Sequence, residues 1–167
     1  MLNVHERLLA VAICGVLSVG AIGCGDDDSP SSPSSPQSLY EKYGGAPTIR
    51  KVVDDAVTGL LADAVQAPFF AVVGQPGHDT PARLTSCLRL QFTAVFGGPA
   101  TYPGRNDQGD MCEDMVTAHS DLAITGPVFD RFITDLVAVL KADGVSDADI
   151  AMVAPALTGL KSSIVTR

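Results

Sequence analysis

Several residue types are scarce in this chain, and their scarcity excludes some functions. Tryptophan is absent, and aromatic residues make up only 5% of the 167 residues. Lysine and arginine total 11 against 19 aspartates and glutamates, and the basic residues form no cluster. The positive surface that holds a nucleic-acid backbone is therefore missing, and we expect no nucleic-acid partner. No acid–base pair or activated nucleophile can be recognised either, so nothing indicates hydrolytic or transfer chemistry.

Convincing β-strand patterns and internal repeats are also missing, and helical patterns take their place. After Pro47 the apolar residues recur every three or four positions along one face: Ile49, Val52, Val53, Ala56, Val57, Leu60 and Leu61. A capping-box spacing at Ser38 predicts a short helix before this one. Further helices are predicted for residues 83–96, for the segment from Thr125 to Gly144, and from Ser146 to the end with a kink at Pro155. The sequence thus predicts an all-α domain.

The N-terminal part differs in character from the rest. Residues 8–23 carry no charge and end in small residues before Cys24, which resembles the lipobox of bacterial lipoproteins, although Ala21 stands where leucine is commonest. We expect a signal peptide at 1–23, a lipid on Cys24, and a disordered Ser/Pro-rich tether at 24–37 before the domain at 38–167. The protein would be exported and anchored by this lipid to a bacterial membrane, on the periplasmic side or the cell surface. An ordinary signal peptide or an uncleaved anchor helix is the alternative.

A lone histidine stands among apolar residues in the second half of the domain. The sequence predicts a short helical turn from Met115 to His119, followed by Leu122, Ile124 and Phe129. By itself such a histidine is more often a structural residue than a ligand.

The order of motifs along the domain changes that interpretation. SLYEKYGG precedes the apolar IRKVVDDAVTGLL helix, APFF forms a corner, GGP ends the next helix before TYPGR, and M-x-x-x-H precedes a helix that begins with phenylalanine. From Ser38 to about Val165 this order resembles the truncated haemoglobins, most closely their first group. The resemblance implies a two-over-two helical sandwich around haem b, with His119 as the proximal iron ligand and Phe70 packed on the porphyrin. It also implies apolar walls from Leu84, Leu88, Ile124 and Phe129.

The opposite side of the expected haem departs from the family pattern. Val57 stands where the family usually has tyrosine, and Leu88 where it often has glutamine. A hydrogen bond to a partly charged ligand is worth roughly 1.5–3 kcal/mol, so oxygen should dissociate about tenfold faster for each lost donor. Gln91 is the substitute donor that we expect, and Thr85 is a weaker one. Such a pocket discriminates less against carbon monoxide and nitric oxide.

The resemblance implies reversible binding of a diatomic gas: oxygen, nitric oxide or carbon monoxide. It also allows nitric oxide dioxygenation, which the missing donors argue against, so enzymatic activity stays open. A haem-free structural or interaction lipoprotein is one alternative, and a gas or redox sensor with an unidentified protein partner is another. His78, in a polar loop, is a less favoured candidate for a sixth iron ligand.

Four cysteines occur, and two of them, Cys14 and Cys24, fall in the N-terminal part. In an exported protein the remaining pair, Cys87 and Cys112, favours a disulfide that closes a loop of about 25 residues and contributes roughly 3 kcal/mol. Two buried free thiols are the alternative. A zinc site formed with His119 would lack a fourth ligand.

Overall fold

The structure is a computed structural model that describes residues 37–167. The predicted signal peptide, the lipidated Cys24 and nearly all of the tether lie outside the described residues. Within them the chain forms short and long helices joined by turns, with a single isolated bridge between Arg105 and Met111. In chain order the elements are α1 (Leu39–Lys42), α2 (Ala46–Ala62), the 3₁₀ helix η1 (Ala67–Phe70), α3 (Pro81–Val95), α4 (Met115–His119), α5 (Gly126–Ala142), α6 (Asp147–Thr158) and α7 (Lys161–Ile164). The all-α prediction is confirmed.

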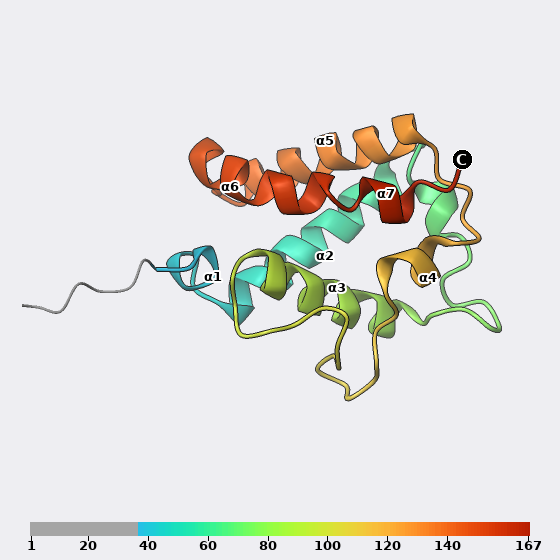
Figure 1. The fold of residues 1–167 in the computed structure, drawn as a ribbon, viewed down its shortest axis with the longest axis horizontal. Coiled ribbons are helices and arrows are strands. Elements are labelled where there is room, and N and C mark those ends of the chain that lie inside the picture. The colour runs from blue at the N-terminus through green and yellow to red at the C-terminus, as the bar shows by residue number, and fades with distance from the viewer. Residues whose placement is uncertain (1–36) are drawn as a thin grey trace, which may run out of the picture. The chain divides into compact units, whose positions relative to one another are not determined.

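Four long helices build the domain in two pairs. Helices α2 and α3 pack on one another, as do α5 and α6, and α2 crosses onto α5 while α3 reaches α6 (Figure 1). The main core fills the space between these pairs, and Leu136, Leu140, Val52 and Val53 are its most deeply buried side chains. The short α4 lies apart from this crossing and contacts α7.

The helix starts are largely those that the sequence predicts. Ser38 Oγ accepts from the Glu41 amide and Glu41 Oε2 accepts from the Ser38 amide, both at 3.2 Å, which completes the capping box. The prediction for Thr125 is half right, because its backbone has the extended N-cap conformation but its side chain makes no capping hydrogen bond. Pro127 lies in the first turn of α5, where its missing N–H costs nothing.

Two predicted details are wrong. Leu61 is predicted on the apolar face of α2, but it is 53% exposed. The buried face of α2 is narrower than the apolar stripe of the sequence, and Leu61 and the half-buried Val57 lie at the edge of that stripe. The C-terminal helix is also not continuous, since α6 ends at Thr158 and α7 begins at Lys161. Pro155 removes one helical hydrogen bond and Gly159 favours helix poorly, so the chain breaks here instead of kinking.

A second hydrophobic cluster lies beside α4. Its buried members are Ile124, Phe129 and Ile164, and Met115, Leu122 and Phe69 pack against it. The chain end is tied to the same place, because the amides of Thr166 and Arg167 both donate to the carbonyl of Ile124 at 3.0 and 3.3 Å. From residue 37 to the C-terminus, no helix has the length and hydropathy needed to span a bilayer.

Candidate functional site

His119 is the last residue of α4 and the chemically distinctive group of this region. Its ring Nδ1 lies 2.8 Å from the carbonyl oxygen of Met115. A carbonyl can only accept, so Nδ1 carries the proton and Nε2 keeps its free lone pair. Burial lowers the pKa of His119 below its usual value, against the opposing effect of the Met115 hydrogen bond. The ring is therefore neutral at pH 7 and can act as a nitrogen ligand through Nε2.

The position of His119 depends on a helix of only five residues. Asp114 caps α4 through Oδ1, which accepts from the Thr117 amide at 2.9 Å. Met115, one turn before His119, faces the second hydrophobic cluster, and Leu122 follows His119 into the same cluster. The position of the imidazole is thus fixed by the helix cap at Asp114, by the hydrogen bond to the Met115 carbonyl, and by the packing of the apolar residues that precede and follow His119.

An open pocket of about 370 Å³ separates α3 from α4 and the C-terminal helices. It is lined by Gln91, Ala94, Val95, Tyr102, Pro103, Met115, Ala156 and Leu160. Gln91 is only 8% exposed, and its Oε1 is buried without a hydrogen-bond partner. A buried amide without a partner is costly, and this one therefore suits a site that a further group completes.

The other polar side chains of α3 are engaged with protein atoms. The Thr85 hydroxyl donates to the Pro81 carbonyl at 3.0 Å, and the Thr93 hydroxyl donates to the Arg89 carbonyl at 2.8 Å. Ser86 is buried and donates to Asp107. Gln91 is consequently the pocket-lining polar side chain of this helix that keeps a hydrogen-bonding atom free.

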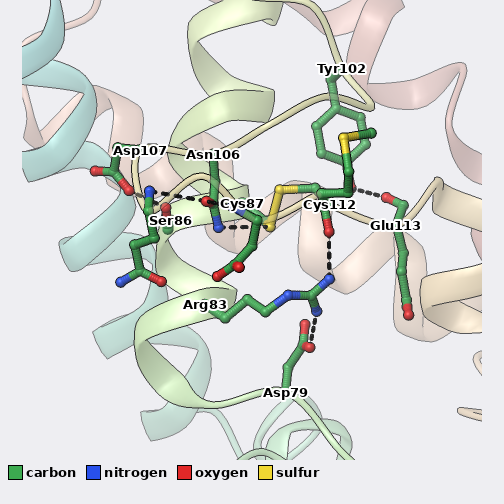
Figure 2. The surroundings of a disulfide bond; sticks show 12 residues. Asp79, Arg83, Ser86, Cys87, Tyr102, Asn106, Asp107, Cys112 and Glu113 are labelled. Carbon is green, nitrogen blue, oxygen red and sulfur yellow. Dashed lines mark hydrogen bonds and ion pairs between the residues drawn. A yellow bond between two sulfur atoms is a disulfide. The ribbon is translucent and has the colours of Figure 1, made fainter.

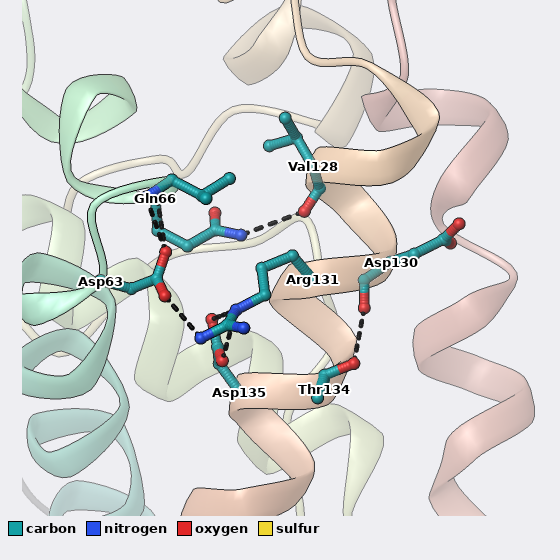
Figure 3. Close-up of polar contacts among 8 residues, drawn as sticks. Asp63, Gln66, Val128, Asp130, Arg131, Thr134 and Asp135 are labelled. Carbon is teal, nitrogen blue, oxygen red and sulfur yellow. Dashed lines mark hydrogen bonds and ion pairs between the residues drawn. The ribbon is translucent and has the colours of Figure 1, made fainter.

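The corner that carries Phe70 is locked to α5 by polar contacts (Figure 3). Gln66, 4% exposed, donates from Nε2 to the Val128 carbonyl at 3.0 Å. Asp63 Oδ1 accepts from the Val65 and Gln66 amides at 2.8 and 3.0 Å, while Oδ2 pairs with Arg131 at 2.6 Å. These bonds fix η1, place Phe69 against the second cluster, and leave Phe70 half-buried beside it in sequence.

The residues singled out from the sequence fall into separate groups. Ile124 and Phe129 lie in the cluster beside α4, whereas Val57 and Leu88 pack on the main core. Leu84 is half-buried on α3, and His78 is exposed in its loop. Sequence reasoning missed the seven pocket residues other than Gln91: Ala94, Val95, Tyr102, Pro103, Met115 as a lining residue, Ala156 and Leu160. Helical spacing after Leu88 and Gln91 could have indicated Val95, but no pattern marks Tyr102.

Cys87 of α3 and Cys112 of the segment before α4 are joined in a disulfide, with their Cα atoms 5.6 Å apart (Figure 2). The alternative of two free thiols is therefore wrong. The zinc alternative is wrong as well, because bonded sulfurs are not available as thiolate ligands. Across residues 37–167, no three His, Cys, Asp or Glu side chains gather as a metal site.

These residues fit an iron porphyrin. A neutral imidazole with a free Nε2 provides the nitrogen that haem iron requires, and its Nδ1–H is already held by a carbonyl. Apolar side chains on α3, at the corner and on α5 are only half-buried, so they keep surface for a flat apolar ligand. Gln91 Oε1 has no hydrogen-bond partner in the protein, so this side chain can form a polar contact with a ligand in the pocket.

Comparison with known proteins agrees with this fit. Residues 38–166 match the family described as bacterial-like globin. The chain is 29% identical over 130 residues to the group 1 truncated hemoglobin GlbN of a Nostoc species, covering 78% of this chain and 98% of that protein. It is 33% identical over 114 residues to the group 1 truncated hemoglobin of Tetrahymena pyriformis, covering 68% and 83%.

A solved structure supports the arrangement of the helices. The 2/2 hemoglobin of a Synechococcus species, crystallised in the cyanomet state with covalently attached heme, superimposes with a TM-score of 0.64 at 28% identity. The superposition covers 78% of this chain and 100% of that one. The two-over-two prediction is thereby confirmed. The chain belongs to the bacterial-like globins, the group 1 truncated haemoglobins, and haem is its cofactor.

Proposed function

We propose that this globin reversibly binds a diatomic gas on a haem whose iron is held by His119. The observation that carries the proposal is the 2.8 Å contact between His119 Nδ1 and the Met115 carbonyl, which fixes the ring and leaves Nε2 free for iron. Haem supplies the iron that binds the gas. The chain supplies the ligand nitrogen, the orientation of its ring and an apolar surrounding.

The remaining side chains form the walls of the haem site in this proposal. Leu84 and Leu88 cover it from α3, and Phe70 from the corner that Gln66 locks to α5. Ile124 and Phe129 stabilise the side of α4, where they are buried together. Because these groups are apolar, they exclude water and offer no hydrogen-bond partner to a charged ligand, so an anion would lose its hydration in the site while a neutral gas loses little.

The side opposite His119 decides which gas is retained. Val57 and Leu88 offer no hydrogen-bond donor, so oxygen gains little stabilisation from them, whereas carbon monoxide and nitric oxide depend less on such a bond. We therefore propose weak oxygen retention with Gln91 as the remaining polar contact. We do not propose nitric oxide dioxygenation, because the geometry gives it no additional donor.

We also propose that the protein is exported and lipid-anchored through Cys24. The charge-free run and the small residues before Cys24 support the proposal. The Cys87–Cys112 disulfide supports export independently, since such bonds persist mainly in oxidising compartments.

The test compares two histidine variants of the same chain. His119→Ala should lose the Soret band after haem addition and keep the far-ultraviolet circular dichroism of the parent. His78→Ala is the matched control, because His78 is exposed in a loop, and it should bind haem as the parent does. A parent chain without a Soret band would favour the haem-free alternative, and a persistent band in His119→Ala would reject His119 as the ligand.

A further inference from the structure

The disulfide lies between the two elements that enclose the proposed haem site. Positions 84, 87, 88 and 91 share one side of α3, so Cys87 lies on the side that carries Leu84, Leu88 and Gln91. Cys112 stands three residues before the start of α4 at Met115. The bond therefore connects the α3 wall directly to the segment that leads into the His119 helix.

Without this bond, α4 is weakly held on its α3 side. A helix of five residues is far too short to be stable alone, and its packing partner among the helices is α7. From α3, Arg83 Nη2 donates to the Met111 carbonyl at 2.6 Å in an exposed position, and Ser86 donates to Asp107 (Figure 2). Asn106 Nδ2 of the segment also donates to Cys87 Sγ at 3.7 Å. These three hydrogen bonds are the polar contacts with α3 that remain for the segment when the sulfurs separate.

The rest of the segment is held mainly by contacts with itself. The Cys112 amide donates to the Gly104 carbonyl at 2.9 Å, and Tyr102 Oη donates to the Glu113 carbonyl at 2.7 Å. Asn106 is 7% exposed, and its Oδ1 accepts from the Gln108 and Asp110 amides at 3.0 and 2.9 Å. These bonds do not involve the S–S bond, so reduction loosens the segment from α3 without unfolding it, and the loosening reaches the start of α4 while α4 keeps its contacts with α7.

We propose that the Cys87–Cys112 disulfide is a redox-controlled clamp that sets how tightly the chain retains haem. A dithiol reductant attacks one sulfur, the S–S bond breaks, and two electrons and two protons give two thiols while the reductant becomes a disulfide. Cys87 is only half-buried, whereas Cys112 is 4% exposed, so Cys87 is the more exposed residue of the pair. Reduction frees the α4 segment and speeds haem release. The inference rests on the proposed ligation by His119.

The experiment uses the haem-loaded full chain, with the ferric haem transferred to excess apomyoglobin as acceptor. The Soret change gives the rate of loss, with and without dithiothreitol, and alkylation with mass spectrometry reports the state of Cys87 and Cys112. We expect reduction to accelerate haem loss about tenfold or more, as an opened loop of 25 residues allows. Reoxidation should restore the slow rate.

Two variants separate the clamp from general instability. Cys87→Ala/Cys112→Ala should lose haem as fast as the reduced parent and should not respond to dithiothreitol. Val53→Ala weakens the main core, where Val53 is 1% exposed, and should change haem loss much less at the same pH. Hydrogen exchange of the haem-free chain should show faster exchange in residues 113–119 of the double variant and unchanged protection in α2.

Each outcome bears on the clamp. A parent that loses haem at the same rate with both thiols alkylated would overturn it, and so would a disulfide that resists dithiothreitol in the folded chain. If the double variant fails to fold, the rates of haem loss from the oxidised and the reduced parent still test the proposal. A parent that never takes up haem contradicts the proposed function instead, which keeps the two failures distinct.

Discussion

His119 is kept neutral by burial, and this gives the haem site a pH dependence. Its pKa is lowered in the folded chain, so the unfolded chain binds the proton more readily. The contribution of neutral His119 to the free energy of unfolding is fully present above the ordinary histidine pKa of about 6.5. It is lost as the pH falls through the lower pKa of the folded chain. In the proposed haem complex, the same proton would compete with iron for Nε2. We predict that the Soret band is lost as pH falls below about 6.5 and through the folded pKa of His119, before circular dichroism shows unfolding; unfolding that precedes loss of the band would contradict this.

Gln91 carries the second residue-scale prediction. Its Oε1 is a buried atom of the pocket without a hydrogen-bond partner, and rotation of the carboxamide would bring the Nε2 donor to the same place, from which it can donate to bound oxygen. Gln91→Leu should therefore speed oxygen dissociation from the ferrous protein by about tenfold and raise the carbon–oxygen stretching frequency of the carbon monoxide complex. Thr85→Val is the control, because the Thr85 hydroxyl already donates to Pro81. Equal rates in Gln91→Leu and the parent would exclude Gln91 as the polar contact.

At the scale of elements, one buried carboxylate joins the first helix to the C-terminal layer. Asp149 in α6 is 5% exposed and accepts from Lys42 at 2.7 Å, from Ser146 Oγ at 2.6 Å and from the Tyr43 hydroxyl. The Lys42 contact, then Ser146 and Tyr43, lower the pKa of Asp149 to about 2. The ionised form therefore stabilises the fold above the ordinary aspartate value, and this stabilisation is lost as pH falls toward 2.

Asp149→Asn tests that link. We expect a lower urea midpoint than the parent at pH 7, and a difference that shrinks as pH falls from about 4, the ordinary aspartate value, toward 2. Asp147→Asn is the matched control, since Asp147 is exposed and its partner Lys141 is exposed as well. A constant difference across that pH range would show that the charge of Asp149 is not the stabilising feature.

The elements themselves were largely predictable, because capping boxes, apolar spacing and glycine after helix ends act locally. Ser38, Gly144 and Ser146 mark boundaries that the structure has within two residues. The break between α6 and α7 was not predictable from Pro155 alone, since proline inside a helix can kink or end it depending on the packing around it. Leu61 shows the same limit, because its exposure of 53% depends on which elements cover α2.

At the scale of the whole molecule, the site joins residues that no local pattern connects. Gln91, Tyr102, Met115 and Leu160 line one pocket but lie up to 69 positions apart, counted from 91 to 160. The family resemblance could indicate His119 and the apolar walls because it fixes their order along the chain. Tyr102 and the free atom of Gln91 follow only from how the irregular segment before α4 folds back onto α3, which depends on contacts distant in sequence.

The proposed lipid anchor involves residues outside the described domain, and its test again uses a matched pair of residues. A thioether-linked lipid on Cys24 would add several kcal/mol of membrane affinity for each acyl chain, at about 0.8 kcal/mol per buried methylene group. The chain expressed in a bacterium that processes lipoproteins should therefore sediment with membranes and incorporate labelled palmitate. Cys24→Ala should abolish the label, whereas Cys14→Ala should keep it, because Cys14 lies inside the expected signal peptide. A labelled Cys24→Ala variant, or an unlabelled parent that is exported and soluble, would contradict the lipid anchor and leave export alone as the role of residues 1–23.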